Sequence, residues 1–203
     1  MNLRRPVALL LAAPLFAALP ALAQATGARH EAAPVEAAPL MPRYLLMDVQ
    51  GRAVTQEDFR GRLQLVSFGF ISCPDVCPTT LLEVKQILGE LGAQAARLQA
   101  IFITVDPARD TREVLREYTA AFDARIMGLT GSPELVRRAA ESFRVQYEIV
   151  REPGAAADNY TMSHTAGMVL LDGRGRFLAR FPYAMPVSQI TDRIRAAIAA
   201  EPR

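Results

Sequence analysis

The chain lacks tryptophan, and aromatic residues make up only 7% of its 203 residues. A broad aromatic platform on which sugars or bases stack is therefore not expected. A surplus of charge is also missing, because the formal net charge is only +2 and two arginines in residues 1–23 account for it. Residues 24–203 are thus close to neutral, and without a basic excess a nucleic-acid partner is not expected.

Cysteine and histidine are scarce: the chain has two of each, Cys73 and Cys77, His30 and His164. A disulfide between cysteines this close in sequence closes a short loop and removes little entropy from the unfolded chain. A purely structural cross-link is therefore a poor explanation for the pair. The close spacing favours a redox or metal-binding role instead.

Residues 1–23 predict an export signal. They begin with two arginines, continue through an apolar run and end in Ala21-Leu22-Ala23, a small-residue cleavage site. The alternative is an uncleaved membrane anchor, although the apolar run is short for a full span and contains prolines. We expect an exported protein in the periplasm or at the outer face of the cytoplasmic membrane, with membrane association only through this segment.

The next segment, residues 24–43, predicts a flexible linker. It is rich in alanine and proline and shows no apolar periodicity, so nothing in it specifies a packed element. His30 lies in this linker and is expected to have no role. The remaining residues, 44–203, are enough for one domain with a full-sized core.

Apolar patterns in residues 44–203 alternate between strands and helices, which predicts an α/β fold. A short hairpin is expected first, at 44–48 and 53–54, followed by a helical turn at 56–59 that Thr55 caps. Residues 151–163 are expected to form a polar irregular excursion. Strands are predicted at 63–70, 98–105, 125–129, 145–150, 165–171 and 176–181. Helices are predicted at 78–91, 110–122, 133–143 and 186–199, the third of them with Ser132 as its cap and Pro133 at its first position.

Both cysteines follow the central strand 63–70, where the chain is about to enter a helix. Pro78 is expected at the first helical position with Cys77 as the N-cap, where free backbone N–H groups would lower the thiol pKa. Cys73 and Cys77 lie about one helical turn apart, so both sulfur atoms can face one point. Cysteines at this place predict a thioredoxin-like three-layer α/β/α sandwich with a mixed sheet, although the dithiol motif of thioredoxins has one residue fewer between its cysteines.

His164 is the histidine of the predicted domain, placed where the irregular excursion enters a strand. On composition alone, a surface or hydrogen-bonded loop histidine is the simpler interpretation. Together with Cys73 and Cys77, however, it completes a three-ligand set for a soft metal, with Cu(I) foremost. Zinc could take the same ligands with a fourth position left open.

The sequence resembles the Sco/SenC family over about residues 44–199. Four motifs in order carry the resemblance: Phe-Ile-Ser-Cys-Pro-Asp-Val-Cys-Pro at 70–78, Thr-Val-Asp-Pro-Ala-Arg-Asp-Thr at 104–111, Gly-Leu-Thr-Gly-Ser-Pro at 128–133, and Ser-His at 163–164 before Val-Leu-Leu-Asp-Gly-Arg-Gly at 169–175. The resemblance implies a thioredoxin-like copper protein. By matching position, its ligands would be Cys73, Cys77 and His164.

The resemblance also implies a function. Family members are linked to building the binuclear copper site of cytochrome c oxidase, so the expected role is a copper chaperone that delivers Cu(I), or Cu(II), to that site. The expected partners are the copper-site subunit of the oxidase and another copper chaperone. Oxidation would join Cys73 and Cys77 in a disulfide that has no thiolate to offer a metal.

The alternative function is a thiol–disulfide oxidoreductase that keeps the cysteines of the oxidase copper site, or of another exported protein, reduced. In that role Cys73 and Cys77 would be the redox-active residues, and His164 would matter little. A peroxiredoxin-like peroxidase is disfavoured, because the chain has no clear Thr-x-x-Cys signature. No enzymatic activity beyond thiol–disulfide exchange is expected.

Other residues near the expected site differ in how far they bear on it. Ser163 departs from the family pattern, which commonly has an acidic residue before the histidine, so a carboxylate that would orient the imidazole is expected to be missing. The Asp106-Pro107 and Asp110-Thr111 pairs are interpreted as a turn and a helix cap rather than a partner contact. Met168 is expected in the core.

Overall fold

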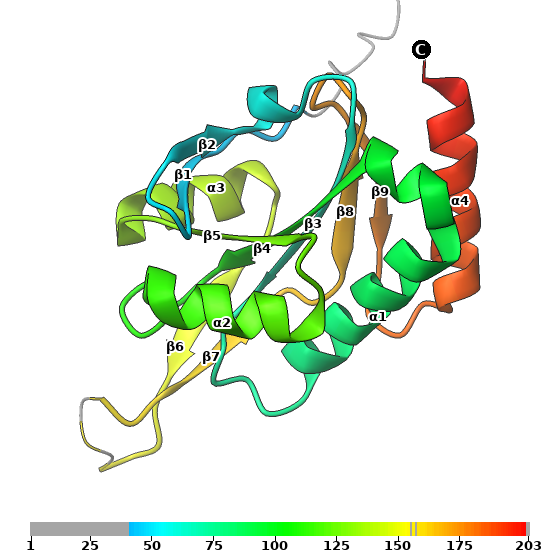
Figure 1. Ribbon diagram of the computed structural model, residues 1–203. Coiled ribbons are helices and arrows are strands. Elements are labelled where there is room, and N and C mark those ends of the chain that lie inside the picture. Colours follow the sequence, from blue (N-terminus) through cyan, green and yellow to red (C-terminus); the bar gives the residue numbers. More distant parts are fainter. Residues whose placement is uncertain (1–40, 155, 157, 202–203) are drawn as a thin grey trace, which may run out of the picture. The chain divides into compact units, whose positions relative to one another are not determined.

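The computed structural model describes residues 41–154, 156 and 158–201 (Figure 1). The predicted export signal and all but the last residues of the predicted linker lie outside the described residues. Among the helices of the described ranges, none is both long and apolar enough to cross a membrane.

A seven-stranded mixed sheet forms the centre of the domain, in the order β2-β1-β5-β4-β3-β8-β9 (Figure 1). The three middle strands β5, β4 and β3 are parallel, and the outer strands pair antiparallel on both sides. The strands are β1 (Leu45–Asp48), β2 (Ala53–Thr55), β3 (Leu63–Gly69), β4 (Leu98–Thr104), β5 (Ile126–Thr130), β8 (Met168–Leu171) and β9 (Phe177–Phe181).

Helices cover both faces of this sheet, as the predicted three-layer architecture requires (Figure 1). One apolar cluster packs α1, α2 and α4 against the sheet, and a second cluster packs α3 against the other face. The helices are α1 (Val76–Leu91), α2 (Arg112–Phe122), α3 (Pro133–Ser142) and α4 (Val187–Ala200), with short 3-10 segments η1 (Gln56–Phe59) and η2 (Gly92–Arg97).

Strand β3 explains why the core has two halves. All seven of its residues are buried, and successive side chains of a strand point to opposite faces. Leu65 therefore packs in the cluster with α1 and α4, while Val66 and Phe68 pack in the cluster with α3. A strand buried on both faces is a rigid base for the cysteine loop that follows it.

A separate two-stranded sheet, formed by β6 (Tyr147–Val150) and β7 (Thr161–His164), extends away from the main sheet (Figure 1). The strand β6 was expected, but the prediction of an irregular excursion through residue 163 is wrong at its end, where β7 lies. The polar side chains of this arm are mostly exposed, and Met162 is the buried residue of β7. The strand thus lacks the apolar alternation that would reveal it in the sequence.

Two helices begin at other residues than predicted. Helix α1 begins at Val76 with Asp75 as its N-cap, so Cys77 lies inside the first turn rather than at the cap. Pro78 is accordingly the third helical residue, a position that proline still tolerates because the N–H groups of the first turn lack helical partners. The N-cap of α2 is Thr111, whose hydroxyl accepts a hydrogen bond from the Val114 N–H.

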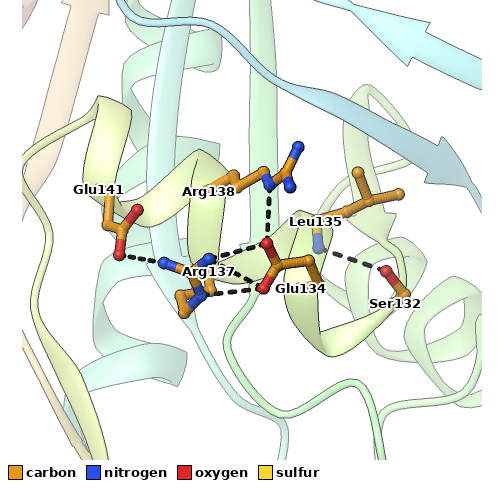
Figure 2. Close-up of polar contacts among 6 residues, drawn as sticks. All are labelled: Ser132, Glu134, Leu135, Arg137, Arg138 and Glu141. Atoms are coloured by element: carbon orange, nitrogen blue, oxygen red, sulfur yellow. Dashed lines mark hydrogen bonds and ion pairs between the residues drawn. The ribbon is translucent and has the colours of Figure 1, made fainter.

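Other local predictions are confirmed. Thr55 caps η1 in a capping box with Asp58, and Ser132 caps α3 with Pro133 in the first turn. On the outer face of α3, Glu134 pairs with Arg137 and Arg138, and Arg137 also reaches Glu141 (Figure 2). Solvent screens exposed pairs of this kind, so α3 is held mainly by its buried face.

The turn after β1 offers a stability prediction. Buried Asp48 accepts hydrogen bonds from the Gln50 and Arg52 N–H groups and from the Arg52 side chain. Burial would raise the pKa of Asp48, but these bonds lower it below the ordinary value. Asp48→Asn is expected to cost about 1–3 kcal/mol of unfolding free energy at neutral pH, whereas Arg52→Ala costs less than about 1 kcal/mol because that side chain is 70% exposed.

The pH dependence of Asp48→Asn checks this assignment. A carboxylate with a lowered pKa stabilises the fold above the ordinary pKa of about 4, and this contribution is lost as the pH falls through the folded-state value. Urea unfolding at neutral pH and in acid should therefore show the deficit of Asp48→Asn shrinking in acid. A deficit that stays constant across this range would show that the negative charge of Asp48 does not contribute.

Candidate metal centre

The cysteine loop begins where β3 ends. The Cys73 N–H donates to the Phe70 carbonyl at 3.2 Å, which turns the chain back toward the sheet after the strand. Cys73 is half-buried in the loop, and Cys77 is buried, only 2% exposed, in the first turn of α1. Both are free thiols. The loop thus presents one accessible sulfur and one enclosed sulfur.

His164 reaches these thiols from the separate arm. It is the last residue of β7 and lies opposite Tyr147 of β6 in the register of the arm. Its Nε2 is 3.5 Å from the Cys77 Sγ, and the two sulfur atoms and a ring nitrogen all lie within 4.8 Å of one another. The structure therefore brings together the three residues that the sequence singled out.

The imidazole is oriented by its own strand end. Its Nδ1 lies 3.1 Å from the Thr165 carbonyl, so the tautomer with the proton on Nδ1 donates there and leaves the Nε2 lone pair facing the sulfurs. The Phe70 ring meets the imidazole edge-on at 6.0 Å between centroids. Ser163 is exposed, and neighbouring strand residues point to opposite faces. The Thr165 backbone carbonyl thus orients the imidazole in place of the carboxylate that is common in the family and that Ser163 replaces here.

The thiol pKa differs from the sequence-based expectation. Burial raises the pKa of Cys77, and a hydrogen bond with Cys73 adds to the effect, although the Phe70 backbone lowers it. The predicted lowering is wrong because Cys77, in the first turn of α1, is buried in the core, where loss of hydration outweighs the effect of the helix terminus. A metal ion that binds there has to displace the thiol proton.

Burial lowers the pKa of His164, with the Thr165 backbone acting in the opposite direction. The imidazole is therefore neutral at ordinary pH. A neutral imidazole is the form that binds metal ions, since its second nitrogen keeps a free lone pair.

Gly69, the last residue of β3, contributes to the site although the sequence analysis did not single it out. A Cβ at this position would lie 2.7 Å from the Cys77 Sγ and 2.8 Å from the Phe102 ring. The absence of a side chain is what lets the buried thiol pack against the strand. A glycine at the end of an otherwise apolar strand is a sequence signal for such a close approach.

The histidine side of the site faces the surface. A hollow of about 430 Å³ is lined by residues at the base of the arm, all of them exposed or partly exposed: Gln146, Tyr147, Glu148, Ser163, His164 and Thr165. The imidazole is only partly buried. His164 thus lies between the buried thiol and a surface hollow.

The donor set is soft. Two thiols and one imidazole match the ligand preference of Cu(I), and they also suit zinc with one position open. Within the described ranges, no other group of three or more histidine, cysteine or acidic residues meets the same distance criterion. Asp75 in the cysteine loop is exposed, and its side chain makes no capping hydrogen bond. Met168 is in the core, as predicted.

Comparison with known proteins identifies the chain's relatives. The SCO1/SenC family model matches residues 32–199. The chain belongs to the SCO1/SenC family. The human mitochondrial SCO2 homolog is 38% identical to it over 157 residues, which cover 76% of this chain and 58% of that relative. This SCO1/SenC chain thus matches less than two thirds of the length of its mammalian relatives.

Solved structures of SCO1/SenC relatives share the fold. The copper-bound ScoI of Bradyrhizobium japonicum is 35% identical, with a TM-score of 0.69, and the match covers 76% of this chain and 97% of that one. The copper-bound ScoI of Arabidopsis thaliana is 29% identical, with a TM-score of 0.72, and the match covers 79% and 98%. These likenesses confirm the predicted thioredoxin-like fold.

Proposed function

We propose that this SCO1/SenC chain is a copper chaperone that holds copper on Cys73, Cys77 and His164. The observation that carries the proposal is the convergence of two sulfurs and a ring nitrogen to within 4.8 Å, from segments 87 residues apart. Thiolates and imidazole favour Cu(I), and the imidazole also gives the site a ligand suited to Cu(II). Cu(I) is the proposed cargo, with Cu(II) as a second oxidation state.

The arrangement of the ligands supports release as well as binding. The thiols lie on the rigid end of β3 and the start of α1, whereas His164 is carried by an arm outside the main sheet. An incoming ligand from a partner can replace the imidazole from the side of the surface hollow and leave copper on two thiolates. Copper would then move by stepwise ligand exchange without being released into solution.

The recipient we propose is the binuclear copper site of cytochrome c oxidase, with the copper-site subunit as partner and another copper chaperone as the donor. The support is family membership, because SCO1/SenC proteins are linked to assembly of this oxidase. Two relatives with this fold have been solved with copper bound. We also propose that residues 1–23 direct export to the periplasm or the outer membrane face, which mass spectrometry of the mature N-terminus would test.

A second candidate function rests on the unequal exposure of the two thiols. Cys73 is accessible and can attack a substrate disulfide, while buried Cys77 can resolve the mixed disulfide that forms. The two thiols would lose two electrons and two protons and become the Cys73–Cys77 disulfide, while the substrate disulfide becomes two thiols. This reductase would act on the cysteines of the oxidase copper site or of another exported protein.

His164→Ala separates the two functions. We expect Cu(I) affinity to fall by about 10–100-fold, because one of three ligands is lost while both thiolates remain. The rate of dithiol–disulfide exchange should change little. Competition with a colorimetric Cu(I) chelator measures the affinity of the reduced protein, and stopped-flow reduction of a small disulfide measures the exchange rate.

His30→Ala is the matched control, since it removes the other histidine, the one in the predicted linker. It should leave Cu(I) affinity unchanged. If His164→Ala binds Cu(I) as tightly as the unaltered protein, the three-ligand site is wrong. If the unaltered protein binds no copper while exchange is rapid, the reductase function replaces the chaperone.

A further inference from the structure

One turn contacts both segments that carry the proposed metal ligands, the cysteine loop and the arm. It comprises residues 106–110, directly after β4, and we call it the bridging turn. The turn is pinned to the end of β4, because the Asp106 N–H donates to the Thr104 hydroxyl at 2.9 Å. Its two aspartates are 3% and 2% exposed. The sequence explains the turn as a local structure, yet its buried side chains are bonded to other segments.

Its first contact is with the histidine arm. Tyr160 precedes β7 directly, and its hydroxyl donates to the Asp106 carboxylate at 2.9 Å. Arg109 donates to the Tyr160 carbonyl at 2.8 Å, and its guanidinium is stacked 3.7 Å from the centre of the Tyr160 ring. Arg109 also pairs with Asp106 through its Nε. Tyr160, and with it the start of β7, is thereby held through the Tyr160 ring, hydroxyl and backbone carbonyl.

Its second contact is with the cysteine loop. The Asp110 carboxylate accepts a hydrogen bond from the Thr104 hydroxyl at 2.5 Å and from the Ile71 N–H at 3.1 Å. Ile71 is two residues before Cys73. The same turn therefore fixes the beginning of the loop that carries the dithiol.

Stability alone is a poor explanation for this arrangement. The Nη2 of Arg109 is buried without a hydrogen-bond partner among the described residues, and a buried unsatisfied donor is destabilising. The chain also has two turns, Asp48–Arg52 and Asp172–Arg176, in which a buried aspartate pairs with an arginine and is bonded only within its own turn. The aspartates of the bridging turn differ from these two, because their side chains also bond to residues outside the turn, Tyr160 and Ile71.

We infer that the bridging turn sets the distance between the dithiol and the third metal ligand, with Arg109 and Tyr160 as positioning residues for His164. This inference rests on the proposed copper site. Tyr160 is four residues before His164, or about 13 Å along a strand. The arm pairs only with itself and shares no strand with the main sheet. Holding Tyr160 therefore restricts where the imidazole can lie.

The inference makes a specific prediction for copper. When Tyr160 is held by Asp106 and Arg109, copper has three ligands. When these contacts are lost, the arm can move, and the two thiolates retain the ion alone. Tyr160→Phe removes only the hydroxyl bond to Asp106 and keeps the ring under Arg109. Arg109→Gln removes the stacking and the bond to the Tyr160 carbonyl. We expect Cu(I) affinity to fall by about 5–20-fold in Arg109→Gln and by less in Tyr160→Phe.

A double-mutant cycle distinguishes positioning from general loss of stability. If Arg109 acts through His164, Arg109→Gln should have no further effect on Cu(I) affinity in a His164→Ala background. Electron paramagnetic resonance of the Cu(II)-loaded protein should show weaker imidazole nitrogen coupling in Arg109→Gln. Arg176→Gln, which removes an arginine that pairs with a buried aspartate of its own turn far from the arm, should leave both readouts unchanged.

Several outcomes would overturn the inference. An equal fall in affinity with and without His164 would show that Arg109 acts on the thiols or on overall stability. Unaltered affinity and nitrogen coupling in both Arg109→Gln and Tyr160→Phe would show that the turn positions nothing. If the unaltered protein binds no copper, the proposed function fails first. Hydrogen exchange of β7 that is no faster in Arg109→Gln would then reject the restraint on the arm separately.

Discussion

Replacing Cys77 by serine is expected to abolish Cu(I) binding by the reduced protein and to leave the domain folded. The Cys77 sulfur lies 3.5 Å from the His164 Nε2, and it is the enclosed member of the dithiol. Serine has nearly the same shape, but its hydroxyl is a hard ligand that Cu(I) does not favour. We expect affinity to fall by at least about a thousandfold, or roughly 4 kcal/mol of binding free energy.

The measurement is chelator competition under anaerobic conditions, with circular dichroism to confirm that the variant is folded. Cys73→Ser should lose copper to a similar extent. The two variants should differ in stability, because Cys77→Ser leaves a hydroxyl in a site built for a sulfur, at a cost of about 1–3 kcal/mol, whereas Cys73 is only half-buried. Retention of tight Cu(I) binding by Cys77→Ser would remove the dithiol basis of the proposed function.

The oxidation state of Cys73 and Cys77 also determines whether Cu(I) binding can be measured. When Cys73 and Cys77 form a disulfide, neither sulfur is a thiolate, so the oxidised protein should bind no Cu(I) until a reductant is added. Chaperone and reductase activities would therefore compete for one pair of sulfurs. A chain that carries copper is protected from oxidation, and a chain that has reduced a substrate has to be reduced again before it can accept copper.

The elements with a clear apolar pattern could be predicted from the sequence. Strand β3 appears as a mostly apolar run because both of its faces are buried. The caps at Thr55 and Ser132 were identified because side-chain chemistry specifies them locally. The hairpin of β1 and β2 was found for the same reason, since its turn residues specify it.

The arm that carries His164 could not be predicted in the same way. Strand β6 falls within the predicted strand 145–150, but β7 has one buried side chain, Met162, among polar residues, so no apolar alternation marks β7. Its position depends on the contact of Tyr160 with Arg109, two residues 51 positions apart. Long-range contacts of this kind are not visible in a local pattern. Consequently His164 was identified by its chemistry, while the strand that places it was not.

The error in the Cys77 pKa has a similar origin. Local rules place thiols near a helix start in a field that favours the thiolate. The depth of Cys77 in the core depends on its close approach to Gly69 of β3 and on a buried cluster whose side chains come from several strands. Burial then dominates the local effect. The identity of the ligands could thus be inferred from residue types, but their electrostatic environment required the tertiary structure.

Gly69→Ala should weaken both the fold and the metal centre. The added Cβ would lie 2.7 Å from the Cys77 sulfur and 2.8 Å from the Phe102 ring, distances at which something has to move. Overpacking of a buried site costs about 1–3 kcal/mol. Because the sulfur is one of the two atoms in the way, the thiol is displaced from His164. We expect Cu(I) affinity to fall by about a hundredfold, or nearly 3 kcal/mol.

Two glycines of the same chain provide controls for Gly69→Ala, with affinity and urea unfolding measured on all three variants. Gly128→Ala, in β5, brings a Cβ 2.7 Å from the Leu115 side chain, so it should cost similar stability without touching a ligand. Gly89→Ala, in α1, meets nothing within 4 Å and should stabilise the helix by about 0.5–1 kcal/mol. A loss of copper affinity in Gly69→Ala but not in Gly128→Ala would assign the effect to the displaced thiol. Equal losses in both would assign it to the weakened fold.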